Sequence, residues 1–294
     1  MDQEELPVRG LGSMSMYDGT IKLSFVSRNG RTVAKDAYRS GNSRISSSIP
    51  TNDGTPYYFL IATGGGYTEG ESYLQEIELE KDTHAVLTTQ TPNYVYKSEN
   101  MKLTRQKAKV DVAKNACLEF YIDETIPYKN AYYRQNTEIS MGHGAKLILT
   151  DGLTSGWSPD ERLFQYRQIG LKTTIRMGSE LLLNDFLLVD PTSEPMHEFG
   201  YFEGKTNFNS VVIIDEDADE KMVDELRKYL NAYRTNSAWG ITLLEKSGLV
   251  LRVMGESAHA NHKLMWHFIE YYRKEILGFE ALDLRKSEHL ELGW

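Results

Sequence analysis

Short segments of alternating apolar and polar residues fill most of the first 190 positions. Between residues 76 and 80, Ile77 and Leu79 alternate with glutamates, so one face is buried and the other is solvated. The same alternation, or a compact aromatic and β-branched run, recurs at 21–25, 57–62, 110–112, 118–122, 145–149 and 181–189. Turn residues at 29–30, 52–54, 142–144 and 151–152 separate these segments. The pattern predicts many short strands.

No long helical period lies between these strands, and this favours an all-β architecture. A parallel α/β fold is disfavoured because its crossover helices are missing. On periodicity alone, a sandwich, a barrel and a β-solenoid all remain possible. No strict repeat length is visible, which weakens the case for a regular solenoid.

The character of the chain changes after about residue 195. A strand at 211–214 precedes a helix with Val223, Leu226 and Leu230 on one face. Strands follow at 240–244 and 249–254, and a second helix carries Met265 and Ile269 on its apolar face. We therefore predict an N-terminal extension at 1–19, a β-rich core at 20–195 and a small α+β lobe with two helices at 196–294. We expect the lobe to pack on the core.

Charge and composition narrow the function classes. The 294 residues include 33 Lys and Arg and 42 Asp and Glu, giving a net charge of -9. This balance argues against a nucleic-acid partner, which needs a basic face. A single cysteine excludes an intrachain disulfide and fits a reducing compartment. The acidic start of the sequence, with Pro7, lacks the basic and apolar regions of a secretory signal, and no apolar run suggests a membrane span. We expect a cytoplasmic protein with no membrane partner.

A glycine-rich run, Gly64, Gly65, Gly66 and Gly70, interrupts the strand pattern. It lacks the Lys-Ser/Thr pair of a phosphate-binding loop, and no helix follows it. We interpret it as a structural loop that needs positive φ angles or a close backbone approach.

Histidines near the C-terminus do not form a metal-binding pattern. His259 and His262 are neighbours on a helix, but His267 lies about 140° around the helix from His262, so the three cannot converge on one ion. The sequence also lacks Cys-x-x-Cys and His-Glu-x-x-His motifs, so we predict no stable metal site.

Acidic residues near strand ends leave an enzymatic alternative open. Asp151, Asp160, Glu161 and Asp185 could pair for hydrolysis, as two carboxylates do in glycosidases. The sequence contains no Gly-x-Ser-x-Gly elbow for a serine nucleophile. A hydrolase using two of Asp151, Asp160 and Asp185 is therefore the second hypothesis, and a plain adhesive β-module is the third.

Several ordered segments resemble one known family. Gly64–Glu71 resembles the GGGY-x-x-GD signature of the UreD (UreH) urease accessory proteins, and Thr88–Lys97 resembles their TTQSATKIYK segment. Residues 118–131 resemble their LEY and IPF-x-DA segments, and Leu183–Asp185 continues the match. Gln135 and Thr137 match the family's Q-x-T. The order and spacing of these segments cover roughly residues 20 to 190, so the resemblance is far more specific than the glycine run alone.

The resemblance implies a fold and a function. The fold is mainly β, a β-helix-like array of many strands, with two helices in the C-terminal lobe. The function is that of an accessory scaffold and not of an enzyme. Such a protein binds apo-urease and recruits UreF and the GTPase UreG, for GTP-dependent nickel insertion into the urease active site. It has no tightly bound cofactor, and nickel is in transit.

The resemblance also suggests where nickel would pass. An internal tunnel has been proposed for the family, and the matching positions here are Asn93, Asp151 and Asp185. Oxygen donors suit nickel(II) and can hold it without trapping it. Three positions depart from the family pattern and indicate a divergent branch. Glu71 replaces an aspartate, Tyr94 replaces a lysine, and Trp157 ends a segment that lacks the usual WEI-x-x-x-GR.

Overall fold

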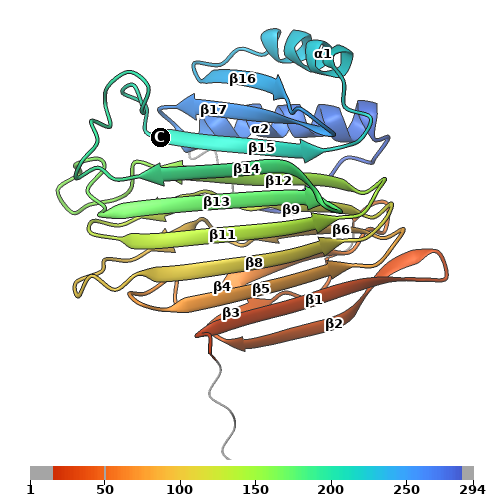
Figure 1. Ribbon diagram of the computed structural model, residues 1–294, viewed down its shortest axis with the longest axis horizontal. Helices are drawn as coiled ribbons and strands as arrows, with labels where there is room; N and C mark the ends of the chain where they lie inside the picture. The colour runs from red at the N-terminus through yellow and green to blue at the C-terminus, as the bar shows by residue number, and fades with distance from the viewer. Residues whose placement is uncertain (1–15, 50, 287–294) are drawn as a thin grey trace, which may run out of the picture.

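Two facing β-sheets make up most of the molecule in the computed structural model, which describes residues 16–49 and 51–286 (Figure 1). Sheet A has seven strands in the order β14-β13-β11-β8-β5-β1-β2. They are β1 (Gly19–Arg28), β2 (Arg31–Gly41), β5 (Ser72–Leu79), β8 (Thr104–Val112), β11 (Tyr132–Met141), β13 (Gln168–Met177) and β14 (Glu180–Val189).

Sheet B has ten strands, eight of them in the order β16-β17-β15-β12-β9-β6-β4-β3, with the short β10 and β7 attached beside β12. They are β3 (Ser43–Ile45), β4 (Tyr57–Ala62), β6 (His84–Thr89), β7 (Asn93–Val95), β9 (Cys117–Tyr121), β10 (Thr125–Pro127), β12 (Lys146–Thr154), β15 (Asn207–Ile214), β16 (Ala238–Leu243) and β17 (Gly248–Gly255).

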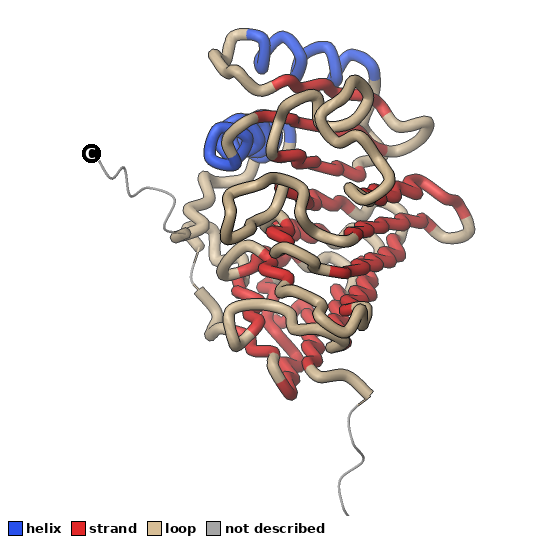
Figure 2. The backbone as a smooth tube through the Cα atoms, turned by 90° about the vertical axis from the view of Figure 1, so that its left-hand side faces the viewer, coloured by secondary structure: helices blue, strands red, loops and turns tan. Residues whose placement is uncertain are grey.

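The chain passes alternately from one sheet to the other, so that each pair of strands forms one coil of a solenoid. In sheet A, β5, β8, β11 and β13 are parallel neighbours, and in sheet B so are β4, β6, β9 and β12. Figure 2 looks along the strands and shows the two stacks side by side. The predicted β-helix-like fold is confirmed. Parallel strands form here without crossover helices because a strand of the opposite sheet makes each return.

The last part of the described chain extends sheet B and covers its outer face. β15 pairs antiparallel with β12, so the residues predicted as a C-terminal lobe hydrogen-bond directly into sheet B. Helix α1 (Glu220–Asn231) begins at the Asp219 cap, and α2 (Ala258–Tyr271) continues into a π-turn, η1 (Tyr272–Ile276). The two predicted helices are confirmed. Neither they nor any other helix of the described ranges is long and apolar enough to cross a bilayer. Of the predicted extension at 1–19, residues 1–15 lie outside the described residues.

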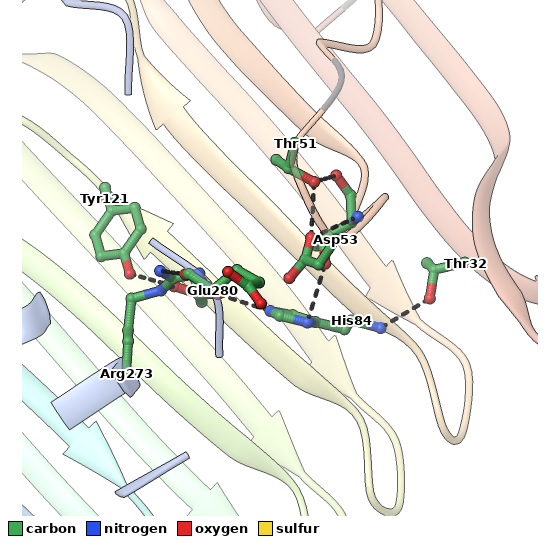
Figure 3. Close-up of polar contacts among 9 residues, drawn as sticks. Thr32, Thr51, Asp53, His84, Tyr121, Arg273 and Glu280 are labelled. Atoms are coloured by element: carbon green, nitrogen blue, oxygen red, sulfur yellow. Dashed lines mark hydrogen bonds and ion pairs between the residues drawn. The ribbon is translucent and has the colours of Figure 1, made fainter. Parts of the chain in front are cut away.

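A buried ionic cluster fastens this C-terminal region to sheet B. Glu119 of β9 is fully buried and lies 2.6 Å from Arg273 Nε and 2.7 Å from His84 Nε2. Tyr121 also donates its hydroxyl to Glu119. Figure 3 shows Tyr121, Arg273 and His84 converging from different parts of the chain. Burial opposes ionisation of Glu119, but the bond from His84 and the charge of Arg273 outweigh burial and lower its pKa.

Two further carboxylates of the same segment bind C-terminal bases. Asp123 lies 2.6 Å from Lys286 Nζ, and Glu124 lies 2.6 Å from His262 Nε2. All three acids therefore lie on six consecutive residues, and each meets a basic group from residues 262–286. This arrangement holds the end of the described chain against sheet B, where Tyr57 also donates to the carbonyl of Leu284.

Arg273→Met should destabilise the protein by about 3–5 kcal/mol, because it leaves the Glu119 carboxylate buried without its main counter-charge. Urea denaturation measures this free energy of unfolding. Lys97→Met is the matched control, since it removes the exposed pair with Glu99 and should leave the stability nearly unchanged. Equal effects of the two substitutions would contradict the fastening role.

Candidate functional site

Polar side chains form rows along the interior of the solenoid. In-register parallel pairing places equivalent inward positions of successive strands side by side. In sheet A, one such row contains mostly hydrogen-bonding side chains where a core would be apolar. Its members, each the register partner of the next, are Gln75, Ala108, Thr137, Thr173 and Asp185. The adjacent row contains Tyr73, Gln106, Gln135, Leu171 and Leu187.

The polar members of these rows form a polar seam between two apolar clusters, and Tyr73 and Leu171 of the second row belong to one of those clusters. The larger cluster includes Phe25, Ile77 and Leu118. The other cluster is rich in aromatic side chains and includes Tyr67 and Tyr133. The interior thus consists of two apolar clusters with a polar layer between them. That layer is where a hydrophilic species could be accommodated.

Asp151 and Asp185 line one small cavity at the end of the seam. The cavity has a volume of about 20 Å³, and Ser210 and Thr173 are its other polar lining side chains. Asp151 occupies an inward position of β12, between Leu149 and Leu153, and Asp185 faces it from β14 of the other sheet. The volume suits one water-sized species. The structure therefore brings together two of the three predicted nickel-route residues.

Asp151 is a partly buried carboxyl without a cationic partner among the described residues. Its Oδ2 accepts a bond of 2.7 Å from Gln135 Nε2, and its Oδ1 accepts one of 2.8 Å from the Gly152 N–H. Burial, together with the charge of Asp185, raises its pKa to about 7 against the opposing effect of these two bonds. Near neutral pH this group can therefore both hold and release a proton.

Asp185 has a different electrostatic environment. Its Oδ1 lies 2.9 Å from Arg252 Nη2, which reaches it from β17 of sheet B. In sheet B, Asp151 pairs with Ser210 and Ser210 pairs with Arg252, so these three residues form one row across neighbouring strands. The cavity is thus flanked by two carboxylates and one guanidinium.

Asn93 lies at a second cavity of about 30 Å³, together with Gly65, Gly66 and Gln75. Both Asn93 Nδ2 and Gln75 Oε1 are buried without a hydrogen-bond partner in the described part of the chain. They supply an unpaired donor and an unpaired acceptor where one or two water molecules would fit. Asn93 does not line the acidic cavity.

The glycine loop forms one wall of this second cavity. Gly64, Gly65 and Gly66 have φ angles of 93°, 77° and 158°, and Gly70 has 77°. A Cβ on Gly66 would lie 2.5 Å from the carbonyl oxygen of Tyr94, so a larger residue does not fit there. The loop therefore has both features expected of a structural turn.

A hydrogen-bonded chain lies between the two cavities. Tyr133 donates to Gln106 Oε1 at 2.6 Å, and its hydroxyl lies 3.4 Å from Gln135 Oε1. Gln135 in turn donates to Asp151. Tyr133, Gln106 and Gln135 are all buried. They make the middle of the seam polar but leave it filled with side chains.

The remaining predicted candidates lie elsewhere. Asp160 is exposed, and bonds to Arg162 and proximity to Lys129 hold its pKa below the usual range. It does not line the cavity of Asp151 and Asp185. His267 packs against Tyr229 and Tyr233. Within residues 16–49 and 51–286, no group of three or more His, Cys, Asp or Glu is arranged to hold a metal ion.

Sequence reasoning gave no site role to four residues of this region: Gln75, Gln106, Gln135, which it noted only as part of a family motif, and Arg252. A signal for them was present. Each is a polar residue at the inward phase of an alternating strand, where the neighbouring inward residues are mostly apolar. In a single strand, one such polar residue looks like an isolated exception to the apolar pattern. Its place in a polar row is recognised only when its register partners in the neighbouring strands are known.

Comparison with known proteins agrees with the sequence motifs. The model of the UreD urease accessory protein family matches residues 17–288. The chain belongs to the UreD family. A UreD urease accessory protein of Streptococcus thermophilus is 42% identical over 273 residues, covering 93% of this chain and 98% of its own length. The corresponding proteins of Actinomyces naeslundii and Lachnoclostridium phytofermentans are 32% and 31% identical, covering 91% and 83% of this chain and 98% and 89% of their own lengths.

The three residues that depart from the UreD motifs each make defined contacts in the structure. Glu71 accepts bonds from the Thr68 N–H and from Asn42 Nδ2, so it ties down the glycine loop. Tyr94 and Trp157 both contact the ring of Tyr128, with centroid distances of 6.3 and 4.8 Å. In this member of the UreD family, these side chains therefore build an aromatic cluster at the surface.

Asp151→Asn should remove a pH dependence of stability. The pKa of Asp151 is about 7 in the folded protein and about 3.9 in an unfolded chain. Between these values the folded state keeps a proton that the unfolded state loses, so the wild type loses stability as pH rises. The variant should therefore gain roughly 2 kcal/mol relative to wild type between pH 5 and pH 8.

Urea denaturation at both pH values measures this difference. Asp111→Asn, which changes an exposed carboxyl on the outer face of sheet A, is the control and should show no such gain. A stability difference between Asp151→Asn and wild type that stays constant with pH would contradict the raised pKa of Asp151.

Proposed function

We propose that this protein is a urease-maturation scaffold that binds apo-urease, recruits UreF and UreG, and lets nickel pass along its polar seam. Its family membership supports a role in urease maturation. The observation that carries the nickel route is the meeting of Asp151 and Asp185 at one water-sized cavity on that seam. The protein makes and breaks no covalent bond in this role and works in the cytoplasm.

The donor chemistry of the cavity suits a cation in transit. Asp151, Asp185 and Ser210 offer carboxylate and hydroxyl oxygens, which nickel(II) accepts alongside water. An arriving cation would displace the proton of Asp151, because metal ligands must be deprotonated. With few protein ligands, no histidine lining the cavity and a competing proton, such a site binds weakly and releases readily.

The same cavity weighs against the hydrolase alternative. Paired carboxylates of which one has a raised pKa are what a glycosidase would use. A volume of about 20 Å³, however, admits a water molecule or a small ion and excludes a sugar or peptide. Asp160, the third candidate for hydrolysis, lies elsewhere on the surface. The conduction role therefore fits the geometry better.

Exposed apolar side chains support a scaffold with large interfaces. Phe186 and Leu188 lie on the outward face of the edge strand β14, and Trp157 and Phe199 lie in exposed loops. Aromatic residues are enriched in the cores of protein interfaces. We assign these surfaces collectively to UreF, UreG and apo-urease.

The variant with Asp151→Asn and Asp185→Asn should lower the nickel content and activity of the urease produced by about tenfold, while complex formation is kept. Loss of the carboxylates removes the anionic oxygens of the cavity but keeps its shape. The measurement is a pull-down from cells expressing the urease genes, followed by nickel analysis and activity assay of the purified urease.

Asp111→Asn serves again as the control because its carboxyl lies on the outer face of sheet A. Unchanged nickel loading by the double variant, with the partners still bound, would show that the two acids are only structural. Loss of the complex would make the variant uninformative about nickel, so Asp151→Asn and Asp185→Asn are also assayed singly.

Expressed alone, the protein should be poorly soluble, and co-expression with UreF should increase the soluble fraction, because the partner covers apolar surface. Centrifugation of lysates followed by quantitative immunoblotting measures the soluble fraction. A fully soluble, monomeric protein that does not respond to UreF would contradict the scaffold role.

A further inference from the structure

We propose that Arg252 is a built-in counter-ion of the acidic cavity, and that it weakens cation binding there so that the cation can be released. This inference rests on the proposed nickel route and adds a residue that sets its affinity. The guanidinium of Arg252 is bound to Asp185 at the position that a cation bound to this carboxylate would occupy. The protein thus carries a positive charge that a passing ion must displace.

The position of Arg252 in the sheet makes this role specific. Arg252 lies on the same face of β17 as Val250 and Met254, which contact the two apolar clusters between the sheets. It therefore belongs to the inward row that also holds Asp151 and Ser210. From there it bonds to Asp185 at 2.9 Å and bridges sheet B to the edge strand of sheet A.

The charges at the cavity explain why this bond matters. Two carboxylates at one small cavity would attract a divalent cation strongly if both were free. Arg252 offsets the charge of Asp185, and its N–H groups only donate, so it competes with a metal for the same oxygen. Binding of a cation at Asp185 therefore requires Arg252 to withdraw.

Solvent exposure makes this withdrawal easy. The side chains of Arg252 and Asp185 are 53% and 34% exposed, in contrast to the sealed pair of Arg273 and Glu119. An ion pair in contact with water is weak, and its guanidinium can move into solvent and remain hydrated. The same arginine can return once the cation leaves, which favours release.

A second ion pair between the same sheets supplies a matched control. Lys246, in the turn before β17, binds Glu180 at the start of β14. Like Arg252, it contributes one positive charge and one bridge from sheet B to sheet A. Unlike Asp185, however, Glu180 does not line the cavity. Substituting Lys246 or Arg252 by methionine therefore changes the net charge equally, but only the substitution of Arg252 removes a charge next to the cavity.

The test measures nickel affinity directly, by isothermal titration of the full chain as a soluble fusion with Ni²⁺ at neutral pH. Arg252→Met should tighten binding about tenfold, because a competing charge is lost. Lys246→Met should bind as the wild type does. Arg252→Lys should restore weak binding, and adding Asp185→Asn to Arg252→Met should abolish the gain.

Unchanged affinity in Arg252→Met, with thermal unfolding like that of the wild type, overturns the inference. Weaker affinity overturns it as well, because Arg252 would then hold Asp185 in place for the cation. Absence of any nickel binding in Arg252→Met also overturns it. These affinity measurements are independent of the nickel loading of urease. The nickel route can therefore be contradicted while the effect of Arg252 on affinity is confirmed, and the effect of Arg252 can be contradicted while the route is confirmed.

Discussion

Parallel, in-register stacking of coils is the constraint on which the rest of this structure depends. Each strand hydrogen-bonds to the equivalent strand of the next coil, so residues at the same phase form continuous rows. An apolar row becomes a strip of core, as in the cluster of Ile77 and Leu118. A polar row becomes a seam that runs from coil to coil. The row of side chains from Gln75 to Asp185 exists because of this register.

Buried and partly buried acids in this protein differ in how their charge is balanced. On the outer face of sheet B, Glu119, Asp123 and Glu124 each meet a basic group of the C-terminal region. Between the sheets, Asp151 receives only neutral donors, and the partner of Asp185 is half-exposed. A balanced buried charge contributes to structure, whereas an incompletely balanced one keeps a capacity to bind protons or cations.

The polar seam carries a cost in stability that an apolar interior would avoid. Gln75 and Asn93 are buried with unpaired polar atoms within the described chain, and such groups destabilise a folded protein unless water satisfies them. Tyr133, Gln106 and Gln135 bond to one another and to Asp151, which offsets part of this cost. We interpret the retained polarity as a functional requirement, because packing alone would favour apolar residues at these positions.

The sequence by itself determined the strand-rich character, both helices and the family, since alternation, capping and ordered motifs are local signals. It also indicated Asp151 and Asp185 through the family motifs. Only the tertiary structure showed that these two residues share a cavity, that Asn93 lies at another, and that Arg252 and Gln135 belong with the acids. The reason is physical: side-chain alternation tells which face of a strand a residue occupies, whereas register and sheet order decide which residues from distant strands meet on that face.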